Sequence, residues 1–143
     1  MWTAGAFGTL EHFTPGIDAR YGNATSASDY LKKSQLAAYE SHRAMFEAYS
    51  RNKYNATGLI QWMLNSAWPS NMWHLFDYYY QVGGSGFGVK KACAAPLHLL
   101  YGYPSQAQKE CGDKECENDS DGHIWVINSQ YTAGPSEMVA EAT

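Results

Sequence analysis

The 143 residues suffice for one domain with a sizeable hydrophobic core, and they could equally be a piece of a larger protein. Ten basic and fourteen acidic residues give a formal net charge of −4. The basic residues are scattered apart from two Lys pairs, at 32–33 and 90–91, so the sequence offers no concentrated positive charge to nucleic acid or to an anionic membrane. We expect neither of these partners.

Signals for targeting are sparse. No stretch is apolar over the length of a membrane span, and the N-terminus lacks the basic and apolar regions of a signal peptide. We therefore expect no targeting signal in the chain itself. Three Asn-x-Ser/Thr sequons, at Asn23, Asn55 and Asn118, are candidate glycosylation sites and favour an extracellular, secreted parent protein.

The N-terminal part divides into a loop and a helix. Residues 2–25 hold five glycine or proline residues between isolated aromatic residues, which predicts an irregular segment. Ser26 and Asp29 have the spacing of a helix-capping box, and no Gly or Pro follows until Gly58, which predicts a helix to about Asn52. Small and apolar residues recur on it every three or four positions and predict close packing against a sheet: Leu31, Ser34, Ala38, Ser41, Met45 and Ala48.

The stretch 57–73 (TGLIQWMLNSAWPSNMW) is the most informative in the chain. Its continuous apolar run at 59–64 predicts a strand, residues 58–64, buried on both faces as in a parallel sheet. Asn65, Ser66, Trp68 and Trp73 follow the end of that strand, where α/β folds place their ligand sites. Aromatic faces and amides suit the C–H faces and hydroxyl groups of a sugar, whereas the alternative interpretation is that the tryptophans only pack in a core.

The second half of the chain is predicted to be mostly β. A short helix is the first choice for residues 72–80, and the glycine-rich stretch 83–88 is interpreted as a flexible turn because it does not fit a nucleotide-binding motif. Residues 96–103 and 124–128 have the composition of strands joined by a polar loop. These two strands predict the beginning of an all-β domain.

Three cysteines leave one thiol unpaired if a disulfide forms. Cys111 and Cys116 flank a turn-like GDKE segment and are the disulfide candidates, which leaves Cys93 as the free thiol. A zinc site made of Cys111, Cys116 and His123 is the alternative, but it lacks a Cys-x-x-Cys pair and a fourth ligand. We therefore predict no metal ion and no cofactor.

Several ordered segments together resemble the exo-β-D-glucosaminidases of glycoside hydrolase family 2. The resemblance runs from about residue 2 to residue 103 and is carried by residues 28–52, 57–70 (TGLIQWMLNSAWPS), 77–80 (DYYY), 87–93 (FGVKKAC) and 96–98 (PLH). The β-mannosidases of the same family share a looser version of two of these elements, Gln-Trp-x-Leu-Asn and Trp-Pro.

This resemblance implies a fold class and a domain organisation. The chain would be α/β, the C-terminal fragment of a (β/α)8 TIM barrel followed by the start of an immunoglobulin-like β-sandwich. Residues 1–94 would supply the last helix-strand-helix units of the barrel, with 58–64 as its eighth strand. Residues 95–143 would open the truncated β domain.

The resemblance also implies an activity for the parent protein, a retaining exo-1,4-β-D-glucosaminidase that acts on glucosamine-containing oligosaccharides of chitosan. The family's two catalytic carboxylates lie on earlier strands, so we expect no catalytic residue here and an inactive isolated fragment. Glu40 and Glu47 on the predicted helix are assigned to solvated or packing roles. Two alternatives stay open, namely a non-catalytic carbohydrate-binding or interaction remnant and a β-mannosidase-type fragment; a third is a truncated product with no function.

Four residues are candidate substrate-binding residues. Trp62 resembles the family's sugar platform at the end of the last barrel strand, and Asn65 and Trp68 follow it on the loop of the catalytic face. Asp77 is the one acidic residue that we place near a substrate, because it follows the tryptophan cluster.

Overall fold

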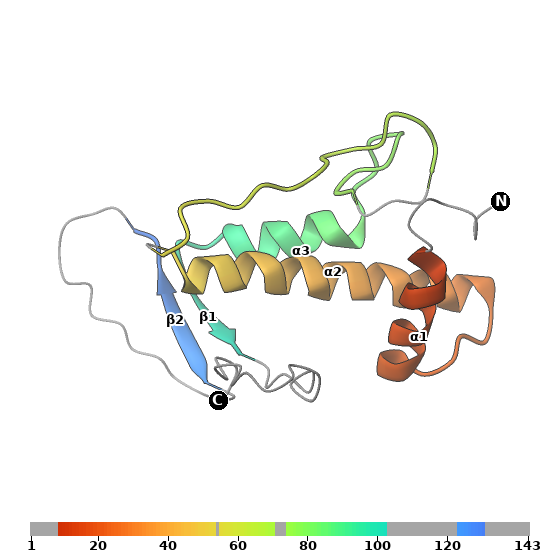
Figure 1. Ribbon diagram of the computed structural model, residues 1–143, viewed down its shortest axis with the longest axis horizontal. Coiled ribbons are helices and arrows are strands. Elements are labelled where there is room, and N and C mark those ends of the chain that lie inside the picture. Colours follow the sequence, from red (N-terminus) through yellow and green to blue (C-terminus); the bar gives the residue numbers. More distant parts are fainter. Residues whose placement is uncertain (1–8, 54, 71–73, 103–122, 131–143) are drawn as a thin grey trace, which may run out of the picture. The chain divides into compact units, whose positions relative to one another are not determined.

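The computed structural model describes residues 9–53, 55–70, 74–102 and 123–130. It contains three helices and two strands in these ranges: α1 (Thr9–Tyr21), α2 (Ala27–Arg51), α3 (Gly84–Cys93), β1 (Leu97–Tyr101) and β2 (Ile124–Asn128). Figure 1 shows them in chain order. The chain forms two compact units that divide between Ala94 and Ala95. The fold is thus mixed, with helices in the first unit and an antiparallel strand pair in the second.

Helix α1 corrects the prediction of an irregular N-terminal segment for residues 9–21. Glu11 lies in its first turn and Arg20 in its last turn, both favourable for the helix dipole. Gly22 ends the helix with a φ of 75°, and its N–H donates to the Asp18 carbonyl at 2.9 Å. The prediction failed because the glycine and proline residues of this segment indicate a loop, whereas α1 contains Pro15 in its interior.

Helix α2 confirms the predicted cap and length. The Ser26 hydroxyl accepts a hydrogen bond from the Asp29 N–H at 3.1 Å, and the Asp29 carboxylate accepts one from the Thr25 N–H at 3.0 Å. At the C-terminal end, the Asn52 N–H donates hydrogen bonds to the Ala48 and Tyr49 carbonyls. The predicted packing stripe is wrong in part, because Leu31 and Met45 are 58% and 49% exposed.

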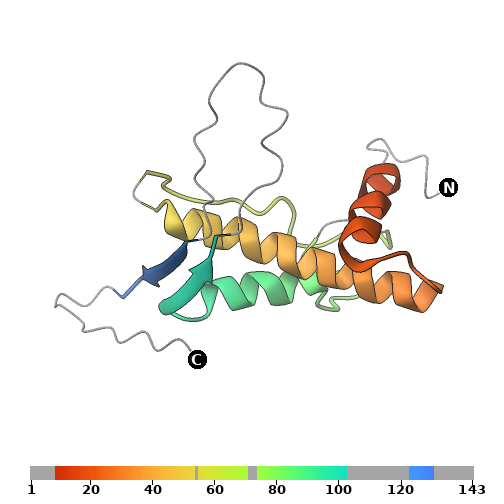
Figure 2. The ribbon, with the colours of Figure 1, turned by 90° about the horizontal axis from the view of Figure 1, so that it is seen from below.

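The stretch 83–88 was predicted to be a flexible turn, but most of it forms the first part of α3. A Cβ atom at Gly84 would collide with the Gln35 carbonyl oxygen, and one at Gly88 with the Tyr39 carbonyl oxygen. Ala92, one further turn along, is 1% exposed. This small-residue face lets α3 lie directly against α2, parallel to it, as Figures 1 and 2 show. Helix α2 therefore packs on a helix within this unit, not on a sheet.

The predicted buried strand at 58–64 is absent. No regular element covers residues 57–64, and Ile60 and Leu64 are 88% and 57% exposed. The peptide bond between Trp62 and Met63 is cis. In Figure 1 this segment runs back along α2 and forms part of the connection between α2 and α3. A continuous apolar run forms a strand only where neighbouring strands supply hydrogen-bond partners, and no strand in the described ranges forms a ladder with residues 57–64.

Residues 74–82 form a compact turn, so the predicted helix at 72–80 is wrong for its described part. The Leu64 carbonyl accepts hydrogen bonds from the N–H groups of Leu75 and Phe76, each at 3.1 Å. Phe76 also bridges to Asn65 in parallel and to Val82 in antiparallel fashion. These contacts join the end of the apolar segment to the start of α3.

The second unit contains the two predicted strands, which the structure confirms. Strands β1 and β2 pair antiparallel, with Leu97 opposite Asn128 and Tyr101 opposite Ile124. Leu100 and Ile127 are the buried side chains of the pair, at 5% and 4% exposed. The candidate disulfide residues Cys111 and Cys116 and the sequon Asn118 lie outside the described residues.

Candidate functional site

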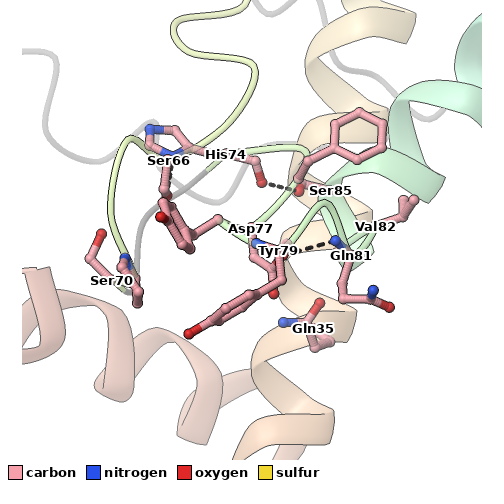
Figure 3. Close-up of a pocket in the computed structure, with 14 residues that line it drawn as sticks. Gln35, Ser66, Ser70, His74, Asp77, Tyr79, Gln81, Val82 and Ser85 are labelled. Atoms are coloured by element: carbon pink, nitrogen blue, oxygen red, sulfur yellow. Dashed lines mark hydrogen bonds between the residues drawn. The ribbon is translucent and has the colours of Figure 1, made fainter.

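A cavity of about 570 Å³ lies in the first unit, between the middle of α2, the turn 74–82 and the start of α3. Its lining is largely polar and aromatic, as Figure 3 shows: Gln35 and Ala38 from α2, Ser66, Pro69 and Ser70 from the connecting segment, His74, Phe76, Asp77, Tyr78, Tyr79, Gln81 and Val82 from the turn, and Gly83 and Ser85 from the N-cap and first turn of α3. Its size is typical of small-molecule sites.

Three buried polar residues hold one wall of this cavity together. The Ser66 hydroxyl and His74 Nδ1 are 2.7 Å apart, and the Ser85 hydroxyl donates to the His74 carbonyl at 2.7 Å. All three residues are under 10% exposed. His74 thus ties the segment that carries Ser66 to the first turn of α3, and buried hydrogen-bonded groups of this kind fix a loop in one position.

Asp77 organises the turn that lines another part of the cavity. Its Oδ1 accepts hydrogen bonds from the N–H groups of Tyr79 and Gln81, both at 2.8 Å, an arrangement that stabilises a tight turn. Tyr80, between them, has a φ of 60°. The Tyr78 and Tyr79 rings meet edge to face with centroids 5.2 Å apart. The carboxylate is therefore held in a defined position at an accessible cavity wall.

The structure brings only one of the four candidate substrate-binding residues to the cavity. Asp77 lines it, whereas Trp62 and Trp68 are 73% and 68% exposed and are not among its lining residues. Asn65 is not a lining residue either, and its Nδ2 donates a hydrogen bond to the Ser66 carbonyl at 3.3 Å. Sequence reasoning missed His74, because its contact with Ser66 joins positions eight residues apart that share no motif.

The carboxylates of α2 have structural partners. Glu40 Oε2 accepts hydrogen bonds from Arg20 Nε at 2.7 Å and from the Tyr21 hydroxyl at 2.5 Å, which joins α1 to α2. The Tyr21 hydrogen bond, followed by the Arg20 contact, lowers the pKa of Glu40 despite its partial burial. Arg43 Nε donates to Glu47 Oε1 at 2.7 Å along the helix. These pairs agree with the packing roles expected for Glu40 and Glu47.

The remaining candidate sites are described only in part. Asn23 and Asn55 are exposed. Cys93 is an exposed free thiol in the part of the chain that the structure describes. Within the same ranges, no group of three or more His, Cys, Asp or Glu side chains is arranged to hold a metal ion. None of the described helices is long and apolar enough to cross a bilayer.

Comparison with known proteins gives a consistent set of relatives. The chain is 47% identical over 105 residues to an exo-β-D-glucosaminidase of Streptomyces avermitilis, covering 71% of this chain and 12% of that protein. It is 38% identical over 142 residues to an exo-β-D-glucosaminidase of Hypocrea jecorina, covering 96% of this chain and 14% of that protein. A mannosylglycoprotein endo-β-mannosidase of Lilium longiflorum is 27% identical over 81 residues. No family model matches the chain.

The structural comparison agrees with the sequence comparison. The crystal structure of the exo-chitosanase CsxA of Amycolatopsis orientalis matches with a TM-score of 0.60 and 45% identity, over 66% of this chain and 11% of that one. Other crystal structures of the same protein contain PNP-β-D-glucosamine. The chain thus spans about a tenth to a seventh of the length of the relatives it matches.

These matches relate the chain to the glycoside hydrolases. The named relatives belong to that class, and the shared segment is long and similar in both sequence and fold. Within that class, the chain is related to a segment of the exo-β-D-glucosaminidases. The resemblance inferred from the sequence is confirmed.

Proposed function

We propose that this chain is a segment of a retaining exo-β-D-glucosaminidase that removes glucosamine from chitosan oligomers. The observation that carries the proposal is the 47% identity over 105 residues to a protein of that activity. Residues 1–94 would belong to the end of a (β/α)8 barrel, and residues 95–143 to the start of an immunoglobulin-like domain.

The arrangement of the first unit supports the barrel assignment. Two parallel helices, α2 and α3, are joined by a return segment that contains the apolar run 59–64. Successive helices of a (β/α)8 barrel are parallel for the same reason, because each is separated from the next by a strand that runs back. In the complete barrel, residues 58–64 would become the eighth strand, flanked on both sides by strands from other parts of the polypeptide.

The same assignment gives the exposed tryptophans a role. The end of a barrel strand and the loop after it face the active site, so Trp62, Asn65, Trp68 and Asp77 would lie on the catalytic face. Exposed indole rings provide stacking surfaces for a pyranose, and an amide provides hydrogen bonds to its hydroxyl groups. The two catalytic carboxylates would come from other barrel strands, so the chain contributes binding and shape, with no cofactor.

The proposed parent protein acts outside the cell. The exposed Asn23 and Asn55 sequons support this proposal, because such sites can be glycosylated on a secretory route. Mass spectrometry of the chain expressed through a eukaryotic secretory pathway would detect glycans on these two residues.

A chimera tests the proposed activity. The aligned part of this chain replaces the matching segment of the Amycolatopsis orientalis exo-chitosanase, and hydrolysis of PNP-β-D-glucosamine and of PNP-β-D-mannoside is measured. We expect the chimera to keep its glucosaminidase activity within about tenfold of the parent enzyme and to prefer the glucosaminide. A folded chimera that prefers the mannoside would favour the β-mannosidase alternative, and one that binds chitosan without hydrolysing either substrate would favour a non-catalytic remnant.

A further inference from the structure

We propose that His74 is a positioning residue for the segment 66–70 and that it holds the Trp68 ring in place as a stacking surface for the substrate. The inference rests on the proposed function, because the ligand of this ring is the sugar of the proposed substrate. It goes beyond that function by giving His74 a role in the reaction that is exerted through another residue, Trp68.

The segment 66–70 has one polar attachment to the rest of the first unit in the described ranges. It belongs to no helix or strand. Its hydrogen bonds there all involve Ser66, whose carbonyl accepts from the neighbouring Asn65 Nδ2 at 3.3 Å and whose hydroxyl lies 2.7 Å from His74 Nδ1. The first contact joins adjacent residues, so the Ser66–His74 contact is the one that fixes the segment to another part of the fold.

The backbone of His74 is held from α3, independently of its imidazole. The Ser85 hydroxyl donates to the His74 carbonyl at 2.7 Å, as Figure 3 shows, and the Gly83 N–H donates to the Leu75 carbonyl at 3.0 Å. Because Ser66, His74 and Ser85 are all buried, their hydrogen bonds form in a region of low dielectric constant, where such bonds are strong. The imidazole thus transmits the fixed position of α3 to Ser66.

The position of Trp68 depends on this anchor. Its side chain is 68% exposed, so packing alone holds the ring only weakly. Pro69 follows it, and a proline restricts both its own φ and the conformation of the residue before it. A short, stiff segment fixed at Ser66 therefore keeps the Trp68 ring in one place. A ring that is already ordered loses less conformational entropy when a sugar stacks on it.

A double-mutant cycle in the chimera with the Amycolatopsis orientalis exo-chitosanase tests whether His74 acts through Trp68. We expect kcat/KM for PNP-β-D-glucosamine to fall about fivefold in His74→Ala and about tenfold in Trp68→Ala. The double variant should be no less active than Trp68→Ala alone, because the anchor has no ring left to position. His74→Asn should restore most of the loss, since its amide can take the place of Nδ1 in the contact with Ser66.

A second measurement observes the positioning in the full 143-residue chain, without catalysis. The heteronuclear NOE of the Trp68 indole N–H reports motion on the picosecond-to-nanosecond scale. It should fall in His74→Ala and also in Ser66→Ala, which keeps the imidazole, while the signal of the Trp62 indole in the same spectra stays unchanged. Either variant suffices for the test if the other fails to fold.

His42→Ala is the matched control. His42 is as buried as His74, but it lies on α2, where its Nδ1 donates to the Ala38 carbonyl at 3.0 Å, and it does not line the cavity. This variant should lower the melting temperature and leave both kcat/KM and the Trp68 signal unchanged.

Fully additive losses in His74→Ala and Trp68→Ala, or an unchanged Trp68 signal in folded His74→Ala and Ser66→Ala, would overturn the inference. An unsubstituted chimera without activity would instead refute the proposed function. The NMR measurement needs no activity, so the two failures are distinguishable.

Discussion

Trp62 and Trp68 expose two of the largest apolar side chains of the first unit, at 73% and 68%. A buried position would favour a core role, whereas both indole side chains are mostly accessible to solvent. Trp62 lies within the apolar run 59–64, and the role proposed for it is that of a sugar platform. Its exposure in the chain is what a ligand platform requires, so its role can be tested by removing the ring.

Trp62→Ala in the chimera should lower kcat/KM for PNP-β-D-glucosamine roughly tenfold. The lost aromatic contact is worth on the order of 0.5 to 1.5 kcal/mol beyond area burial, and about 1.4 kcal/mol corresponds to a factor of ten. Trp62→Phe keeps a ring and should recover most of the activity. If Trp62→Ala lowered the melting temperature while kcat/KM stayed the same, Trp62 would be a core residue and not a platform.

Glu40 gives the contact between α1 and α2 a predictable pH dependence. Its folded-state pKa lies below the ordinary value of 4.5, so its contribution to stability is complete above about pH 4.5 and is lost as the pH falls through the lowered pKa. Burial, followed by the hydrogen bond to Glu40, raises the pKa of Tyr21 above 10, so this hydroxyl stays protonated through neutral pH.

The pH dependence can be measured by thermal melting of the helical circular dichroism signal. We expect the midpoint of the 143-residue chain to fall as the pH drops from 6 to 3, and to fall less for Glu40→Gln. Arg43 and Glu47 lie on α2 alone, so Glu47→Gln serves as a matched control that leaves the α1 contact intact. An identical pH profile for Glu40→Gln and the unchanged chain would contradict this role of Glu40.

The elements of the first unit depend on one close helix pair. Gly84 and Gly88 allow the backbone of α3 to approach the Gln35 and Tyr39 carbonyls of α2, and the Gln35 side chain caps the first N–H of α3. Glycine in a helix costs about 1 kcal/mol relative to alanine. The unit therefore gives up helix propensity at these positions in exchange for close packing.

Gly84→Ala should open this helix pair. The added Cβ collides with backbone that cannot move aside as a side chain could, and overpacking of this kind costs about 1 to 3 kcal/mol. Hydrogen exchange of the α3 amides in the 143-residue chain should become faster, by roughly tenfold or more. Gly16→Ala in α1, where a Cβ would meet nothing within 4 Å, should leave α3 exchange unchanged. Equal exchange in both variants would contradict the close-packing role.

Local signals in the sequence predicted part of this fold. The Ser26 cap and the uninterrupted pattern after it predicted α2, and β-rich composition predicted β1 and β2. The prediction failed for α3, because glycines that serve close helix packing look the same in sequence as glycines of a turn. It also failed for 58–64, because a buried strand depends on partners that the local sequence does not reveal.

The candidate site shows the same limit. Asp77 was singled out as the acid nearest a ligand, and it does line the cavity. The role of its Oδ1 as a turn acceptor and the Ser66–His74 contact depend on how residues 64–85 fold together. Such contacts between positions several residues apart leave no periodic pattern, so the sequence could not predict them.

The described part of the chain exposes much apolar surface. Leu59 and Met63 are 43% and 40% exposed, and the five described hydrophobic residues that are buried are Ile17, Leu75, Ala92, Leu100 and Ile127. Within the described residues, so small a core offsets little of the conformational entropy lost on folding. We therefore expect the isolated chain to be marginally stable and to associate through the segment 57–64.

The isolated chain should also be inactive on chitosan oligomers and on PNP-β-D-glucosamine. Retaining hydrolysis needs two carboxylates about 5 to 5.5 Å apart, and Asp77 is the sole acidic residue among the described cavity residues. Glucosamine release by the purified 143-residue chain should equal that of a heat-treated control. Release clearly above that control would show that the chain holds a complete catalytic site.

Hydrogen exchange of residues 58–64 distinguishes a barrel strand from a surface segment. If this segment is the eighth strand of a glycosidase barrel, its amides form no strand ladder in the isolated chain and gain ladder hydrogen bonds on both sides in the assembled enzyme. We predict rapid exchange of these amides in the 143-residue chain and exchange at least about a hundredfold slower in the chimera. Rapid exchange in an active, folded chimera, or strong protection in the isolated monomer, would contradict the assignment of this chain to the glycosidase barrel.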